Sequence, residues 1–379
     1  MGVERDIAGI ALFFIAGTAA GEILCTTDRL SAAAAAIFAA ASALLAALMY
    51  LKCRPRRDTP ESPLSENKYV RVIIPAMFLL AGMSGAAGDR FGSCIRIRDT
   101  FLPASLLHEA AVSCSEAFRE AIDAVPFGDR DCNALAKALL SGDKSDVSRT
   151  INDAFRESGA SHILALSGMH LGVMYWILLK MTSVFGNFPA VRKTRSCLII
   201  LISAWYTLIT GASASLVRAL LFISLNESAK MAGRETRPMN TFFIALVVQL
   251  TISPHNVTEA GFQLSYLAMA GIYLVYPKMK DWYPGNGRNP LKRLWDTAAL
   301  SISCQLFTGP AVWLIFGTFP KYFLVTNLLA VPLSTFIMIL SAAAVFLHHF
   351  GLCPDFLISL GTESIRLLTD ILSIVSSLP

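Results

Sequence analysis

A short stretch near the middle of the chain places two histidines and a serine among apolar residues and small glycines. These candidates are His162, Ser167, Gly168 and His170. Polar side chains are unfavourable in hydrocarbon, so inside an apolar segment they should face protein or water. The first interpretation is close helix packing with hydrogen-bonded histidines, because small residues let helices approach each other. A Ser/His hydrolytic pair is the weaker alternative, since the sequence supplies no clear orienting acid or oxyanion site.

A second stretch places a cation beside the start of a helix. Ser213 or Ser215 is suited to cap this helix, and Arg218 would then lie in its first turn. The helix dipole disfavours a positive charge there, so an anion should lie nearby. Two partners are open: a carboxylate, from Glu259 or Glu157, or a phosphate held by Arg218 together with backbone amides.

A third stretch combines polar and aromatic residues. Gln263 and Ser265 are polar positions inside an apolar run. The aromatic and apolar residues around them form one helical stripe, made of Phe262, Tyr266, Met269, Tyr273 and Tyr276. Such rings can stack nucleobases at about 1–3 kcal/mol each. The more ordinary interpretation is a packed core or an aromatic belt at the membrane interface.

The chain has eight cysteines but no Cys-x-x-Cys or Cys/His spacing typical of a metal site. We therefore expect no metal and no cofactor. Cys94, Cys114 and Cys132 fall in a segment that we place outside the cell membrane, where disulfides can form. A Cys94–Cys132 disulfide is one hypothesis, and three unpaired thiols are the other, because pairing cannot be deduced from sequence.

The elements that position these residues are predicted to be membrane helices. Of 379 residues, 54% are hydrophobic and only 16% are charged, and the mean hydropathy is +0.56. A bilayer-spanning helix needs about 20 apolar residues. The runs that approach or reach this length are Ile7–Leu24, Leu30–Leu51, Val70–Ala87, Ser196–Thr210, Met239–Ile252, Phe262–Tyr276 and Phe323–Leu347. The sequence thus predicts an all-α polytopic membrane protein with about nine to eleven transmembrane or re-entrant helices, plus amphipathic surface helices.

The distribution of basic residues predicts the orientation. Lys and Arg gather in loops that the alternation of spans places on one side, beginning with the Pro-rich linker near residues 52–71. The positive-inside rule makes that side the cytoplasm. We expect a multi-pass protein of the bacterial inner membrane with a cytoplasmic N-terminus.

Four regions follow from this pattern. Residues 1–88 should hold three transmembrane helices with the basic cytoplasmic linker, and residues 89–160 an external segment with amphipathic helices. Residues 161–350 should form the membrane core, and residues 351–379 a C-terminal amphipathic helix with one polar stripe.

In order and spacing, several of these stretches resemble the ComEC family of DNA-uptake channels. The resemblance runs from about Leu135 to Leu347. It is carried by Ala138–Asp143, Ser161–Gly172, Thr210–Ala219, Gly261–Gly271, Phe316–Pro320 and Thr326–Pro332.

The resemblance implies a channel that passes single-stranded DNA into the cytoplasm during natural transformation, with no catalytic residue of its own. Candidate residues of the DNA path are His162, Ser167, Gly168, His170, Ser213, Ser215, Arg218, Gln263, Ser265, Tyr266 and Asn327. Expected partners are an external DNA receptor, a cytoplasmic helicase-like motor and a separate nuclease, and a homo-oligomer is open. We expect neither the OB-like nor the metallo-β-lactamase-like domain of longer members here. The alternatives are a membrane-embedded enzyme and a non-transporting scaffold of the competence machinery.

Overall fold

The computed structural model describes residues 2–24, 37, 41, 68–94, 102–184, 186, 188–285, 289–317 and 319–378, and every regular element in these ranges is helical. The predicted all-α class is therefore confirmed. The chain divides into two compact units: residues 1–102 with 235–263, and residues 103–234 with 264–379. Residues 103–160 and the C-terminal helix belong to the second unit, and the four regions predicted from the membrane pattern stay a prediction.

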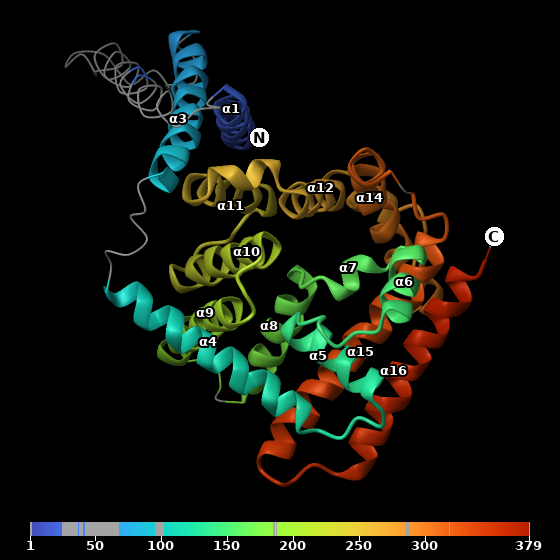
Figure 1. The fold of residues 1–379 in the computed structure, drawn as a ribbon. Helices are drawn as coiled ribbons and strands as arrows, with labels where there is room; N and C mark the ends of the chain where they lie inside the picture. Colours follow the sequence, from blue (N-terminus) through green and yellow to red (C-terminus); the bar gives the residue numbers. More distant parts are fainter. Residues whose placement is uncertain are drawn as a thin grey trace. The chain divides into compact units, whose positions relative to one another are not determined.

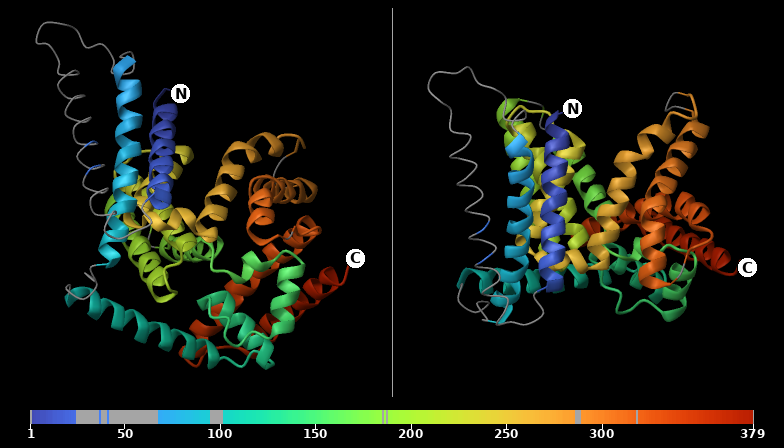
Figure 2. Two further views of the ribbon diagram at one scale, coloured as in Figure 1. Left: turned by 45° about the horizontal axis from the view of Figure 1, so that its top comes forward. Right: turned by 90° about the horizontal axis from the view of Figure 1, so that it is seen from above.

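The first unit contains α1 (Gly2–Leu24), α3 (Lys68–Cys94), α11 (Pro238–Ile252) and the short 3-10 helix η3 (Pro254–Thr258). Helices α1 and α3 lie side by side in both views of Figure 2. Their contact depends on small residues: a Cβ at Gly17 would strike the Leu79 carbonyl, and a Cβ at Gly82 would strike the Phe14 carbonyl. This is the close backbone approach expected of membrane helices. The predicted second span, Leu30–Leu51, lies almost wholly outside the described residues.

The second unit begins with α4 (Leu102–Asp123), α5 (Arg130–Ser141), α6 (Arg149–Glu157) and α7 (Ser161–Leu164). It continues with α8 (Gly168–Ser183), α9 (Pro189–Ile209), α10 (Ala214–Met231), α12 (Ala260–Leu274), which starts in the first unit, and α13 (Tyr276–Lys280). It ends with α14 (Pro290–Phe316), α15 (Phe323–His349) and α16 (Asp355–Ser376). Figure 1 shows α15 and α16 crossing beside α5, α6 and α7.

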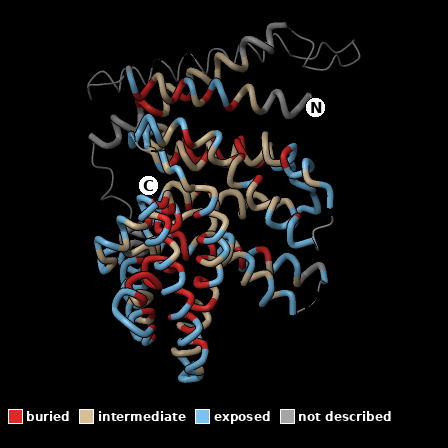
Figure 3. Tube along the Cα trace, turned by 90° about the vertical axis from the view of Figure 1, so that its right-hand side faces the viewer, coloured by how far each residue is buried: buried red, intermediate tan, exposed pale blue. Residues whose placement is uncertain are grey.

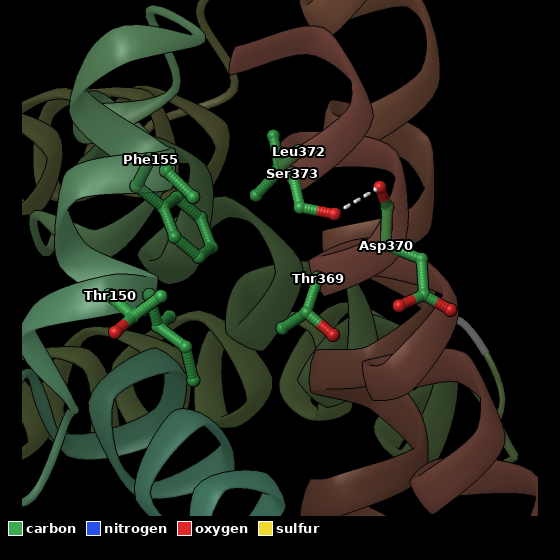
Figure 4. Close-up of a pocket in the computed structure, with 8 residues that line it drawn as sticks. Thr150, Phe155, Thr369, Asp370, Leu372 and Ser373 are labelled. Carbon is green, nitrogen blue, oxygen red and sulfur yellow. Dashed lines mark hydrogen bonds between the residues drawn. The ribbon is translucent and has the colours of Figure 1, made fainter. Parts of the chain in front are cut away.

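Helices α5, α7, α15 and α16 share one hydrophobic core. Its fully buried side chains include Leu135, Leu139, Ile163, Ile337 and Leu368. Buried and exposed positions alternate along the tube of this unit in Figure 3, as expected for helices that pack on one face. A shallow cavity of about 150 Å³ separates α6 from α16, with Phe155 on one wall and Thr369 and Leu372 on the other (Figure 4).

The turns of this region follow from capping residues. The side chain of Asp129 accepts a hydrogen bond from the Cys132 amide at 2.9 Å and starts α5, and Ser148 caps α6. Lys137, only 9% exposed, then joins the end of α4 to the loop before α6 through Asp123 at 2.7 Å and Asp146 at 3.0 Å. These paired charges tie the end of α4 and the loop before α6 to α5, whose apolar side chains lie in the core.

Cys132 lies in this core as a free thiol with 3% exposure. The Cys94–Cys132 disulfide stays a prediction, because the two cysteines belong to different units. The side chain of Cys94 lies outside the described residues.

Two of the described helices, α14 and α15, are long and apolar enough to cross a bilayer, each with 27 residues. Four other apolar stretches, in α1, α3, α11 and α12, are shorter. The total of nine to eleven spans stays a prediction.

Candidate anion site at the start of helices α8 and α10

Arg218 is a buried cation near the start of α10. Ser213 caps this helix by accepting a hydrogen bond from the Leu216 amide at 3.4 Å. Arg218 follows one turn later and is only 7% exposed. Its Nη2 donates to the Ser215 hydroxyl at 3.4 Å, and its guanidinium carbon lies 5.7 Å from the centre of the Tyr266 ring. The sequence predicted the correct helix for this arginine. In the structure Arg218 lies one residue after the first turn rather than within it.

The guanidinium is not neutralised by an acid. Within the described residues of the second unit no carboxylate pairs with Arg218, and its Nη1 is buried without a hydrogen-bond partner. Of the two predicted carboxylates, Glu157 makes no ion pair with it, and Glu259 pairs with His255 at 3.6 Å in the other unit. A buried charged donor without a partner is unfavourable, which favours an external anion as the partner.

Helix α12 contributes the third side of the site. The hydroxyl oxygens of Ser215 and Ser265 lie 3.0 Å apart. Ser265 and Tyr266 are neighbours on α12, so one turn of that helix touches Arg218 through both a hydroxyl relay and an aromatic face. A cation over an aromatic ring gains about 0.5–2 kcal/mol. The aromatic stripe of the sequence therefore contributes Tyr266 to the arginine site as a packing partner.

Helix α8 meets α10 at the same place. A Cβ added to Gly168 would lie 3.3 Å from Arg218 Nη2 and 3.5 Å from the Cβ of Ala219. Farther along both helices, Tyr175 of α8 donates a hydrogen bond of 2.6 Å to Glu227 of α10. The contact near Gly168 and Arg218 comes before the contact between Tyr175 and Glu227 along both helices. The two helices therefore run parallel, with their N-termini at the same end. The positive ends of two helix dipoles therefore add to the charge of Arg218.

Ser167 and His170 cap α8. The Ser167 hydroxyl accepts from the Met169 amide at 3.3 Å, and the Ser167 amide donates to His170 Nδ1 at 3.1 Å. Because Nδ1 accepts, the ring proton is assigned to Nε2, which is buried without a hydrogen-bond partner in the described residues. Among the described residues no carboxylate hydrogen-bonds the ring, and Ser167 and His170 are arranged as a helix cap.

The remaining candidates do not join this cluster. His162 is exposed, with Nδ1 3.3 Å from the Gly159 carbonyl. The amide of Gln263 donates to the Val257 carbonyl at 2.8 Å and closes the turn between η3 and α12. Asn327 of α15 has a buried Oδ1 with no hydrogen-bond partner in the described residues, and no interaction joins it to Arg218. Those residues also contain no group of three or more His, Cys, Asp or Glu placed to hold a metal ion.

A second polar cluster was missed by the sequence analysis. Glu227 is 2% exposed and accepts three hydrogen bonds of 2.6 Å, from Tyr175, Ser196 and Lys230. Lys230 also donates to the Tyr175 hydroxyl at 2.8 Å. The cluster joins α8, α9 and α10. Two signals were available in the sequence: an acid in an apolar helix, and a lysine three residues after it.

Together the fold and the site define an all-α membrane protein with a buried, acid-free cation where two helix N-termini meet. Comparison with known protein families identifies the family of the chain. It belongs to the competence protein family, whose pattern matches residues 139–379.

Similar proteins agree with this assignment. The chain is 26% identical over 257 residues to the ComE operon protein 3 of Bacillus subtilis (strain 168), covering 64% of this chain and 31% of that protein. It is 25% identical over 182 residues to the competence protein ComA of Neisseria gonorrhoeae, covering 46% and 26% of the two chains. An uncharacterised protein of Escherichia coli (strain K12), YcaI, is 24% identical over 233 residues, covering 58% and 30%. The chain thus spans about a third or less of these relatives, and no solved structure matches it.

Proposed function

We propose that this chain forms the membrane part of a DNA-uptake system in the bacterial inner membrane, where it passes single-stranded DNA into the cytoplasm during natural transformation. Membership of the competence protein family supports a role in DNA uptake. The relative from B. subtilis is named for the ComE operon, and the relative from N. gonorrhoeae is named as a competence protein. The channel activity itself is our proposal, as is the multi-pass arrangement with a cytoplasmic N-terminus.

The observation that carries the proposal is the unpaired guanidinium of Arg218. A phosphodiester has one negative charge and only acceptor oxygens, so it can take the hydrogen bond that Nη1 does not make. The converging N-termini of α8 and α10 add two favourable dipoles. None of these groups reads a base edge, which suits a path that must accept every sequence.

The groups around the Arg218 guanidinium suit repeated binding and release of the phosphates of a moving strand. The guanidinium is held by a hydroxyl and a ring rather than by a carboxylate, so a passing phosphate has no fixed anion to displace. Each phosphate can then exchange with the next along the strand. An external DNA receptor would deliver the substrate, a helicase-like motor would draw it in, and a separate nuclease would remove the other strand.

The test is a set of charge variants of Arg218 in the full chain, reconstituted in nanodiscs with a fluorescent single-stranded oligonucleotide. We expect Arg218→Gln to weaken binding about tenfold or more, the effect of losing roughly 1.4 kcal/mol. The slope of log K against log salt should fall by about 0.7, the value for one phosphate contact with a single strand. Arg218→Lys should retain the salt slope with weaker binding, because a lysine keeps the charge without the planar donor pair.

Arg366→Gln is the matched control, because Arg366 is half exposed and already pairs with Asp129 and Glu363. It should leave binding and salt slope unchanged. A complementary measurement is transformation frequency in a strain lacking the gene, restored by each variant at equal membrane abundance. Wild-type DNA binding and transformation by Arg218→Gln would remove Arg218 from the mechanism.

A further inference from the structure

An apolar groove lies between α8 and α15, apart from the arginine site. Its volume is about 400 Å³, and its walls are formed by Met169, Gly172, Val173 and Trp176 of α8 with Thr335 and Ile339 of α15. Gly172 keeps the groove open, since no atom lies within 4 Å of the position that a Cβ would take. The four α8 residues lie three, four and seven positions along from the first, so they form one face of the helix.

The lining offers almost nothing to a polar occupant. The one hydroxyl, of Thr335, donates to the Val331 carbonyl of its own helix at 2.9 Å, and otherwise contacts only the Met169 sulfur at 3.8 Å. A water in this groove would lack the two to four polar partners that it needs. A nucleobase would leave its own donors and acceptors unpaired. The groove therefore suits hydrocarbon.

One end of the groove carries the marks of a membrane interface. Trp176 is 51% exposed, and the ammonium group of Lys180 lies 5.8 Å from the centre of its ring, one helical turn farther along α8. Tryptophan with a nearby lysine is typical of the level where acyl chains give way to head groups. An exposed ammonium at that level attracts anionic lipid.

We propose that this groove binds one acyl chain of an anionic phospholipid, with the head group beside Lys180. A groove of about 400 Å³ has room for a segment of one acyl chain. The inference uses the proposed function only in that α8 lies in the bilayer beside α15. The lipid would fill the space that Gly172 leaves between the two helices.

The test is quenching of Trp176 fluorescence by brominated phospholipids in liposomes that contain the full chain. The other tryptophans, Trp205, Trp282, Trp295 and Trp313, are replaced by phenylalanine. We expect brominated phosphatidylglycerol to half-quench Trp176 at a mole fraction several-fold lower than brominated phosphatidylcholine. Gly172→Leu should abolish this low-concentration phase by filling the groove, and Lys180→Gln should make the two lipids equal.

A matched control reports on ordinary lipid contact. A variant that retains only Trp205, which is 37% exposed on α9, should be quenched in proportion to the bulk fraction of either lipid. If the phenylalanine background does not fold, native mass spectrometry of the otherwise unchanged chain counts the phospholipid retained with and without Gly172→Leu.

Three results would overturn the proposal: the same lipid dependence for Trp176 as for Trp205, no effect of Gly172→Leu on quenching or on retained lipid, or preferential quenching of Trp176 by aqueous acrylamide. The last would make the groove a wet surface open to the DNA strand. Arg218→Gln should leave the lipid signal intact, so failure of the lipid site and failure of the DNA path are distinguishable.

Discussion

The three-helix junction at Glu227 allows one prediction to be worked in detail. Oε1 of Glu227 accepts from Tyr175 and Lys230, and Oε2 accepts from Ser196, each at 2.6 Å. Both oxygens are therefore used, and the carboxylate needs no further partner. We expect this junction to stabilise the bundle formed by α8, α9 and α10.

The expected magnitudes follow from the number of bonds that each substitution removes. Ser196→Ala and Tyr175→Phe each delete one interhelical hydrogen bond, worth about 0.6–1.7 kcal/mol within a membrane protein. Glu227→Ala leaves two hydroxyls and Lys230 without their acceptor. Removing one partner of a buried ion pair costs about 3–5 kcal/mol, and since Lys230 is 50% exposed, we expect about 2–4 kcal/mol. Glu227→Gln keeps one carbonyl oxygen and should lie between these limits.

The assay is unfolding of the purified chain in mixed micelles by a denaturing detergent, followed by helical circular dichroism. Because Tyr175 and Ser196 bond the same carboxylate, their losses should depart from additivity by about 0.5–3 kcal/mol. Each should be strongly non-additive with Glu227→Ala, which already removes both bonds. Ser183→Ala is the control, since the Ser183 hydroxyl bonds only the Lys180 carbonyl of its own helix at 2.7 Å.

Wild-type stability of Glu227→Ala would refute the reasoning outright. So would full additivity between Glu227→Ala and Ser196→Ala, because the two changes would then act at independent places. A loss as large for Ser183→Ala as for Ser196→Ala would show that serine hydroxyls stabilise individual helices, with no special role for the junction.

Three further outcomes follow from the same structure. Gly142 ends α5 with φ of 78°, and a Cβ there would strike Leu166. Gly142→Ala should therefore lower the free energy of unfolding by about 1–3 kcal/mol in the same detergent titration. An unchanged midpoint would contradict this. A Cβ at Gly271 would strike the Ser303 carbonyl, so Gly271→Ala should lower the melting temperature, whereas Gly261→Ala, which meets no atom within 4 Å, should not. The Ser145 amide, with the nearby Arg119 charge, holds the pKa of Asp143 below its usual value. The contribution of the Asp143 carboxylate to stability is therefore present above about pH 4 and is lost as the pH falls through the lowered pKa. Asp143→Asn should reduce the loss of stability at acid pH, and an unchanged loss would exclude this carboxylate.

The parts of the fold that the sequence predicted well are those set by local chemistry. The sequence predicts amphipathic helices within residues 89–160, and α5 and α6 begin there because Asp129 and Ser148 supply capping oxygens. The all-α class followed in the same way from long apolar runs with few charges. Such features depend on neighbours within a few residues.

The features that the sequence did not predict depend on contacts between distant helices. Glu227 meets Ser196 across 31 positions and Tyr175 across 52 positions of the chain. Likewise, the choice between a carboxylate and a phosphate for Arg218 could not be made from spacing, because it depends on which helix faces the guanidinium. The helix that does so, α12, presents Tyr266 and Ser265 rather than an acid.

Helix α10 carries both Arg218 and Glu227, and these two buried charges differ in whether they are paired. Glu227 and Arg218 are nine residues apart, about 13 Å along the helix axis. If buried charges on this helix served packing alone, both should be fully paired, since an unpaired buried charge destabilises the fold. The acid is fully paired, whereas the guanidinium retains an unused buried donor. The junction at Glu227 fixes α8 and α10 in register, so that their N-termini and Gly168 remain beside Arg218, which is the arrangement that the proposed phosphate path requires.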